Sequence, residues 1–204
     1  MKFFKWKIFI ITGIVCLLPI FFGAAFWNKL PETMAIHFNI YGEPDGFASK
    51  TFVVYGLPIL MVLIQAFYCF AGDFQTCKNG KTNHFDTVSK WLVPTLTVVL
   101  YVLTIGVGIG WKVDMRKAAC LVVGAMFFVI GACLPKADRI KNYKIPPEKA
   151  LKINRFTGVE MVILGILFVI SCFLTPMYSA ACMFLLILFT LISIIYAIIV
   201  IRKK

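Results

Sequence analysis

Residues 177–201 read MYSAACMFLLILFTLISIIYAIIVI, a run of 25 positions without a charged side chain. A helix rises about 1.5 Å per residue, so roughly 20 apolar residues cross the ~30 Å hydrocarbon core of a bilayer. This stretch is therefore long enough to cross a membrane as a helix. Strands of a membrane β-barrel would be about 10 residues long with alternating polar positions, and the stretch shows no such alternation.

Five further stretches share this apolar character, and only the fifth of the six contains a charged residue, Glu160. The four tryptophans, at positions 6, 27, 91 and 111, lie at the ends of the first and third stretches. An indole ring favours the membrane–water interface because its body is apolar and its N–H needs a polar partner. The predicted membrane spans are residues 8–27, 51–72, 91–111, 118–134, 158–174 and 177–201.

The composition of the whole chain agrees with this pattern. Of 204 residues, 61% are hydrophobic and 15% are charged, and the mean hydropathy is +0.90. Soluble domains have about 45–50% apolar and about 25% charged residues. The composition excludes an ordinary soluble enzyme, a disordered chain and a secreted disulfide scaffold. It predicts an all-α polytopic membrane protein, a bundle of six transmembrane helices in a single membrane domain, 1–204, with halves at 1–111 and 112–204.

The distribution of basic residues predicts the orientation. The formal net charge is +12, and 16 of the 21 Lys and Arg residues fall on one side if the spans alternate. The more basic side of a membrane protein is usually cytoplasmic. We therefore expect a cell-membrane protein with both termini cytoplasmic, an outward loop at 28–50 and a basic cytoplasmic loop at 135–157. The charge excess then reflects topology rather than direct nucleic-acid binding. The basic loop is either simply solvated, which we favour, or in contact with anionic membrane lipid.

The first stretch has two interpretations. A basic start followed by an apolar run and small residues at 23–25 is also found in cleaved signal peptides. The apolar run here is longer than a typical signal core, so we favour an uncleaved membrane anchor.

Seven cysteines give no C-x-x-C pair; five of them lie within predicted spans and a sixth, Cys69, lies near the end of one. Cysteine in such positions behaves as a small apolar residue, so we expect neither disulfides nor a structural zinc site. The nucleophile and metalloprotease motifs G-x-S-x-G and H-E-x-x-H are absent from the sequence. We therefore expect no cofactor and no enzymatic activity.

Three features inside the spans concern packing or function. Gly106 and Gly110 form a G-x-x-x-G pair, which predicts close helix packing. Pro19 and Pro58 can kink the first and second spans. Glu160 is a functional candidate because a carboxylate inside a membrane is costly. It also fits a T-x-x-E capping box and could pair with Arg155. We favour these structural interpretations of Glu160 over a transport or catalytic role.

The outward loop, residues 28–50, is the most informative segment. Apolar and other side chains alternate over residues 34–41, which predicts an extended segment. The tetrapeptide EPDG at 43–46 predicts a turn. Ser49 or Thr51 is expected to cap the second span. His37, Glu43 and Asp45 could form a metal or acid–base site. The ordinary interpretation, which we favour, is that Asp45 forms the turn and His37 bonds the backbone.

Residues 30–50 read LPETMAIHFNIYGEPDGFASK, and a proline-containing apolar span follows them. The pattern L-P-x-x-x-x-I-H-F-N-x-x-G-x-P-D-x-x-x-S-K resembles the N-terminal domain of unknown function of the sporulation-delaying-protein immunity family. Residues 131–136 and 154–158 partly resemble two later segments of that family, whereas its G-I-R-x-P-W stretch is missing here. The residues that match the loop pattern are Pro31, His37, Asn39, Gly42, Pro44, Asp45 and Lys50.

The resemblance implies a small membrane protein that protects a cell against a membrane-active toxin peptide. It also implies a toxin-facing outward loop and a transcriptional repressor as a cytoplasmic partner. The alternative function is a small transporter or channel that uses Glu160, because transporters need polar groups near the bilayer midplane. Thus two classes of function remain open from the sequence.

Overall fold

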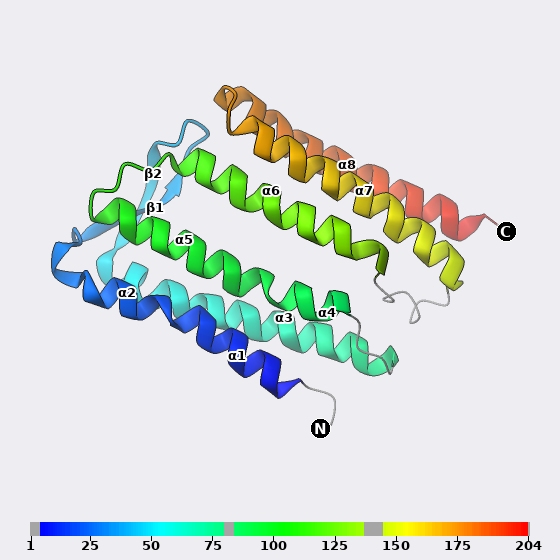
Figure 1. The fold of residues 1–204 in the computed structure, drawn as a ribbon, viewed down its shortest axis with the longest axis horizontal. Helices are drawn as coiled ribbons and strands as arrows, with labels where there is room; N and C mark the ends of the chain where they lie inside the picture. Colours follow the sequence, from blue (N-terminus) through cyan, green and yellow to red (C-terminus); the bar gives the residue numbers. More distant parts are fainter. Residues whose placement is uncertain (1–4, 80–83, 137–144, 204) are drawn as a thin grey trace. The chain divides into compact units, whose positions relative to one another are not determined.

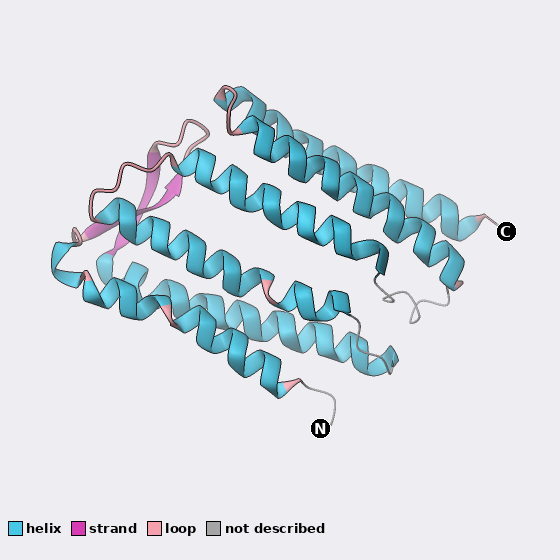
Figure 2. Ribbon diagram, in the orientation of Figure 1, coloured by secondary structure: helices cyan, strands magenta, loops and turns pink. Residues whose placement is uncertain are grey.

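The computed structural model describes residues 5–79, 84–136 and 145–203. In these residues helices dominate and one short β-hairpin follows the first span (Figures 1 and 2). Apolar side chains that fill whole helical turns produce the long helices. In chain order the elements are α1 (Trp6–Leu17), α2 (Pro19–Ala25), η1 (Trp27–Lys29), β1 (Thr33–Phe38), β2 (Pro44–Ser49), η2 (Phe52–Gly56), α3 (Leu57–Asn79), α4 (His84–Lys90), α5 (Leu92–Gly108), α6 (Met115–Cys133), η3 (Leu134–Lys136), α7 (Pro147–Ser171) and α8 (Pro176–Arg202).

Within the described residues, six helices or helix pairs are long and apolar enough to cross a membrane, which confirms the predicted all-α, polytopic fold class. The fifth begins earlier than predicted because Pro147 starts a helix that continues directly into the apolar stretch. The orientation of the termini stays a prediction. The observed spans are Trp6–Ala25, Phe52–Asp73, Phe85–Gly108, Met115–Lys136, Pro147–Ser171 and Pro176–Arg202.

The chain folds as two compact units. The first comprises Met1–Phe74 and Lys90–Ala119, and the second comprises Gln75–Ser89 and Cys120–Lys204. The first unit holds the hairpin and most of the first three spans. The second holds most of α6 together with α7 and α8. Residues 137–144 of the predicted basic loop lie outside the described residues.

Prolines interrupt the spans of the first unit and leave two carbonyl groups without their helical donors. Pro58 cannot donate to the carbonyl of Val54, and Pro94 cannot donate to that of Lys90. Side chains of other helices replace the missing donors: the Tyr101 hydroxyl donates to Val54 O at 3.0 Å and Gln65 Nε2 donates to Lys90 O at 2.9 Å. The irregular backbone is thus satisfied inside the protein, as a spanning segment requires.

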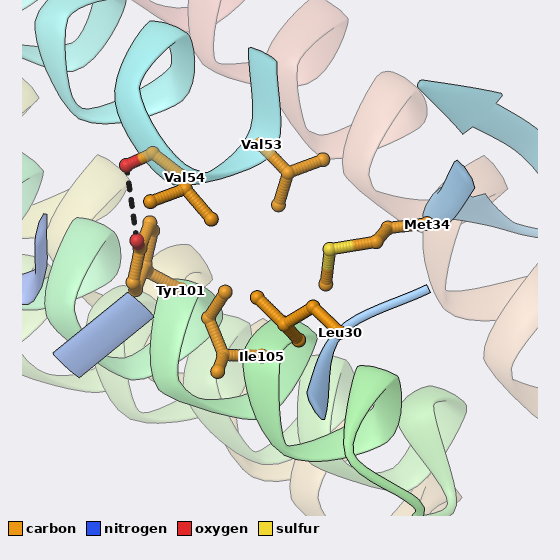
Figure 3. Packing of buried hydrophobic residues seen from close by; sticks show 6 residues of the cluster. All are labelled: Leu30, Met34, Val53, Val54, Tyr101 and Ile105. Carbon is orange, nitrogen blue, oxygen red and sulfur yellow. Dashed lines mark hydrogen bonds between the residues drawn. The ribbon is translucent and has the colours of Figure 1, made fainter. Parts of the chain in front are cut away.

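The apolar core of the first unit lies where the hairpin meets the helices (Figure 3). Gly23 lies so close to the Tyr101 hydroxyl that an added Cβ would be 2.1 Å from it, and a Cβ on Gly108 would be 2.6 Å from Met34 Cε. These two glycines therefore let α2 and β1 approach α5. The buried cluster consists of Leu30, Met34, Val53, Val54, Tyr101 and Ile105.

The second unit packs α6 on α7 through two pairs of glycines. A Cβ on Gly124 would be 2.7 Å from the carbonyl oxygen of Gly165, and one on Gly131 would be 2.6 Å from that of Gly158. On each of the two helices the glycines are seven residues apart, so the two glycines of one helix lie on the same face of that helix. Small residues at such positions let membrane helices approach closely.

Gly106 and Gly110 do not form the predicted surface for close packing of two helices. Gly110 follows the end of α5 with φ +97°, so the two residues do not share one helix face. The Gly110 N–H donates to Val107 O at 3.0 Å and the Trp111 N–H to Gly106 O at 2.8 Å. This is the Schellman pattern that ends a helix. The Trp111 ring then covers Gly106, where an added Cβ would be 2.2 Å from the indole.

Candidate functional site

Residues 34–38 of the segment predicted to be extended lie in β1, which pairs with β2 as a two-stranded antiparallel hairpin, whereas residues 39–41 lie in the turn. Met34 faces Ala48 and His37 faces Gly46 across the ladder, and the register shifts on both sides of His37. Such irregularities bend and twist a hairpin. Met34 is only 2% exposed and lies in the core of the first unit. The hairpin is thereby fixed to the helices by one face.

The turn between the strands is built by Asn39 and not by residues 43–46, so that prediction is wrong. Asn39 Oδ1 accepts the N–H groups of Tyr41 at 2.9 Å and Glu43 at 3.0 Å, and the Gly42 N–H donates to Asn39 O at 2.9 Å. Gly42 has φ +85°, a conformation that favours glycine. Pro44 instead begins β2, where its missing N–H is tolerated at a strand start.

His37 and Asp45 meet across the hairpin. The His37 Nδ1 atom and the Asp45 Oδ1 atom are 2.5 Å apart, and both side chains are exposed to solvent. The expected roles, a turn for Asp45 and a backbone bond for His37, therefore give way to a direct bond between the side chains. Gly46 makes this possible, because a Cβ there would be 2.8 Å from the His37 Cβ.

Lys50 fixes the base of the hairpin. Its ammonium group donates to Glu32 Oε1 at 2.8 Å and lies 4.7 Å from the centre of the Trp27 ring, while its backbone N–H donates to Glu32 O at 2.8 Å. A cation over an indole face is attracted by the ring quadrupole. Ser49 Oγ accepts the Phe52 N–H at 3.3 Å, which confirms its expected role as a cap. Pro31 is exposed between η1 and β1.

The tip of the hairpin lies against the start of α6. A Cβ on Gly42 would be 3.4 Å from Arg116 Cβ and 3.6 Å from Asp114 Oδ1. Desolvation raises the pKa of Asp114, but the Lys117 N–H at 3.0 Å and the charges of Lys117 and Arg116 lower it more, so the net pKa is below its usual value. Asp114 thus provides a negative charge next to the hairpin turn at neutral pH.

Four large side chains of the hairpin remain exposed. Phe47 is 61% exposed and Tyr41 63%, although Met34 on the same hairpin is buried. The remaining two are Ile36 and Ile40. Together with the polar pair His37 and Asp45 they give the hairpin a mixed aromatic and polar surface. Such a surface has the chemistry to bind a peptide or a lipid.

Glu160 lies in the second unit, apart from this hairpin in the chain. It is 9% exposed, and Ser193 of α8 donates a hydrogen bond to its Oε2 atom. Thr157 Oγ1 lies 3.0 Å from Ser193 Oγ, which extends the cluster. The capping-box interpretation is wrong, because α7 begins at Pro147 and Glu160 is in its interior. Arg155 is exposed on the same helix.

The sequence reasoning missed a buried ion pair in the first unit. The Lys90 ammonium donates to Asp73 Oδ1, and these residues are 2% and 4% exposed. Asp73 also accepts the Lys5 N–H at 3.0 Å, and Gln65 Nε2 donates to Thr12 Oγ1 at 2.8 Å. Gln65, Cys69 and Asp73 recur every four residues on α3, and this spacing was the available signal. Asp73 and Lys90 both fall just outside the predicted spans, 51–72 and 91–111.

Among the described residues no group of three or more His, Cys, Asp or Glu side chains is arranged to hold a metal ion. His37 and Asp45 form a pair, and the Glu43 carboxylate accepts from Asn39 Nδ2 at 3.2 Å. His37, Glu43 and Asp45 therefore do not form one cluster of three in the described structure.

A family model described as a domain of unknown function (DUF1648) matches residues 14–62. This segment runs from α1 through the hairpin into α3, so it includes all seven residues of the loop pattern. Neither a curated protein nor a solved structure gives a significant match to the chain. The chain is thus a membrane-type protein that carries this domain at residues 14–62, with six apolar helices in its described residues.

Proposed function

We propose that this protein is a non-enzymatic receptor or immunity protein of the cell membrane that recognises a membrane-active peptide on its hairpin. The observation that carries the proposal is the hairpin itself. One face of it is fixed to the helix core, whereas Tyr41 and Phe47 are left exposed. A pre-formed surface with aromatic side chains binds with little ordering cost. The resemblance of residues 30–50 to the toxin-immunity family supports the same ligand class.

The proposal includes the predicted orientation, with the hairpin outside and both termini in the cytoplasm. It is supported by the uneven distribution of basic residues. A Tyr41→Cys variant should react with a membrane-impermeant maleimide in intact cells, whereas Lys152→Cys should react only after permeabilisation. The unmodified protein gives the background of the native cysteines. The reverse pattern of labelling would place the hairpin inside and remove the basis of the proposal.

Protection of cells tests the function directly. The gene is expressed in a sensitive bacterium, and the inhibitory concentrations of a panel of membrane-active peptides are measured. We expect protection against at least one peptide, and we expect Phe47→Ala and Asp45→Asn to reduce it. Phe184→Ala is the matched control, because Phe184 is 73% exposed on α8. The proposal fails if no peptide is affected, or if the hairpin variants, present at equal amounts, protect as well as the parent.

Signalling to a cytoplasmic repressor is the second part of the proposal. The partner would bind the basic segment 135–157, of which α7 supplies the part from Pro147 onward. A pull-down of the repressor with and without the protective peptide tests this part. Signalling requires that capture of the repressor depends on the peptide. Capture that is absent, or that is the same without the peptide, would leave the protein as a simple immunity factor.

A small transporter or channel is the second candidate, and the Glu160 cluster favours it. The carboxyl group is buried between α7 and α8 with two hydroxyl groups as neighbours. Ionisable groups inside membrane spans often mark ion or proton pathways. Flux of H⁺ or Na⁺ into proteoliposomes that is lost in Glu160→Gln would support this function. Glu148→Gln, in an exposed pair with Lys152, is the control that should retain flux.

A further inference from the structure

α7 carries an exposed apolar stripe that ends at a free cation. Val159, Ile163, Ile166 and Ile170 are each between 43% and 58% exposed. Their spacing of three or four residues places them on one face of the helix, and Arg155, four residues before Val159, continues the same face. The Arg155 side chain is exposed, and within the part of the chain that the structure describes no hydrogen bond or ion pair joins its guanidinium group to another residue.

The contacts between α7 and α8 show where this stripe lies along the helix pair. Lys149 Nζ donates to the carbonyls of Ile201 and Lys203 and so caps the end of α8. The start of α7 lies beside the end of α8 (Figure 1). Phe156 stacks on Tyr196 at 4.1 Å, which fixes the antiparallel pairing. Arg155 is six residues beyond Lys149, about 9 Å along the axis. The basic residues at this end of the α7–α8 pair thus lie within a narrow band, from Lys149 to Arg155 along the helix axis.

The width of this band, about 9 Å, is slightly larger than the polar layer of a bilayer. A bilayer is about 40–45 Å thick with its headgroups and about 30 Å without them, so each headgroup layer is about 5–8 Å deep. Arg202 and Lys203 also lie in the band and are exposed. Lys152 is paired with Glu148 at 2.8 Å, which leaves Arg155 as the cation of α7 nearest the apolar stripe. From Val159 to Ile170 the stripe is about 16 Å long, close to one ~15 Å leaflet.

We propose that this face of α7 is a binding site for one anionic phospholipid, with its phosphate on Arg155 and an acyl chain along Val159 to Ile170. The charge of the headgroup complements a guanidinium group that has no protein partner among the described residues. Guanidinium binds phosphate oxygens through two parallel N–H donors, which gives both geometry and energy. The apolar stripe supplies the matching surface for the chain. This site is independent of the hairpin and of the proposed peptide ligand.

Lipid quenching of a tryptophan placed in the stripe tests the site. Val159→Trp is reconstituted in phosphatidylcholine vesicles that contain either brominated phosphatidylglycerol or brominated phosphatidylcholine as quencher, with the parent protein as background. Near a membrane surface one basic residue contributes about 1 kcal/mol, equivalent to a preference of about fivefold for the anionic lipid. Ile187→Trp, on the exposed surface of α8, is the matched control and should show a ratio near one.

A second substitution separates a site from a general charge effect. Adding Arg155→Gln to Val159→Trp should reduce the ratio to near one, whereas Arg155→Lys should retain most of it. Equal quenching by both lipids at position 159 would overturn the proposal. So would a preference that survives Arg155→Gln, or the same preference at position 187, because the lipid would then be responding to the whole charge of the protein.

Discussion

The buried pair of Lys90 and Asp73 should be the most sensitive point of the first unit. Removing one partner of a buried ion pair leaves an uncompensated charge and costs about 3–5 kcal/mol. The two side chains are 2% and 4% exposed, so water cannot replace the lost partner. We therefore expect Lys90→Met to destabilise the protein by this amount. Asp73→Leu should have a similar effect because it leaves the ammonium group unpaired.

The double variant Lys90→Met with Asp73→Leu should recover most of the loss, because apolar side chains then fill the space. A residual cost is expected, since the Lys5 N–H loses its acceptor on Asp73. Unfolding by dodecyl sulfate in mixed micelles, followed by circular dichroism, measures the three free energies. Lys152→Met removes an exposed ion pair and should leave stability nearly unchanged. If the two single costs simply add in the double variant, within about 0.5 kcal/mol, the pair does not act as a unit and the reasoning is refuted.

Three further changes test other contacts. Gly158→Ala places a methyl group 2.7 Å from a carbonyl of α6 and should cost about 1–3 kcal/mol in the same unfolding assay, whereas Gly13→Ala, with open space around its Cβ, should be neutral or stabilising. Tyr101→Phe leaves a buried carbonyl unpaired and should cost about 1–3 kcal/mol, and the exposed Tyr178→Phe should not. Gly42→Ala, at φ +85°, should cost about 1–2 kcal/mol and speed amide exchange over 33–49 but not in α7. Unchanged exchange in the hairpin would show that this turn does not limit its opening.

The spans could be predicted because their signal is local: an uncharged run of about 20 residues has few other uses. The hairpin was predicted only in part. The period-two pattern of residues 34–41 correctly indicated the strand at 34–38, but residues 39–41 belong to the turn. Its turn was misplaced because Pro44, Asp45 and Gly46 form a stronger turn signal than Asn39 alone. The side chain of Asn39, which accepts two backbone N–H groups, decided the outcome.

Long-range contacts explain the remaining differences. The G-x-x-x-G pair at Gly106 was misinterpreted because the motif does not show where a helix ends. The glycines that do pack two helices recur at seven residues on α6 and again on α7, and this became meaningful only once the two helices were seen to be neighbours. The burial of Lys90 was likewise missed because it depends on a contact with a distant part of the chain. The spacing of Gln65, Cys69 and Asp73 marks a polar face of α3, but the local pattern does not show that Lys90, 17 residues later, is the partner buried against it.

The two units satisfy their backbone polar groups in different ways, and this difference predicts which unit responds when a ligand binds. The second unit uses unbroken helices that approach through glycines, a regular arrangement with little to rearrange. The first unit uses prolines whose freed carbonyls depend on Tyr101 and Gln65, together with a hairpin tied down by Lys50. The segment matched at 14–62 lies wholly in this unit. A peptide bound at the hairpin should therefore alter amide exchange around η2 and α5, while α7 and α8 remain unchanged.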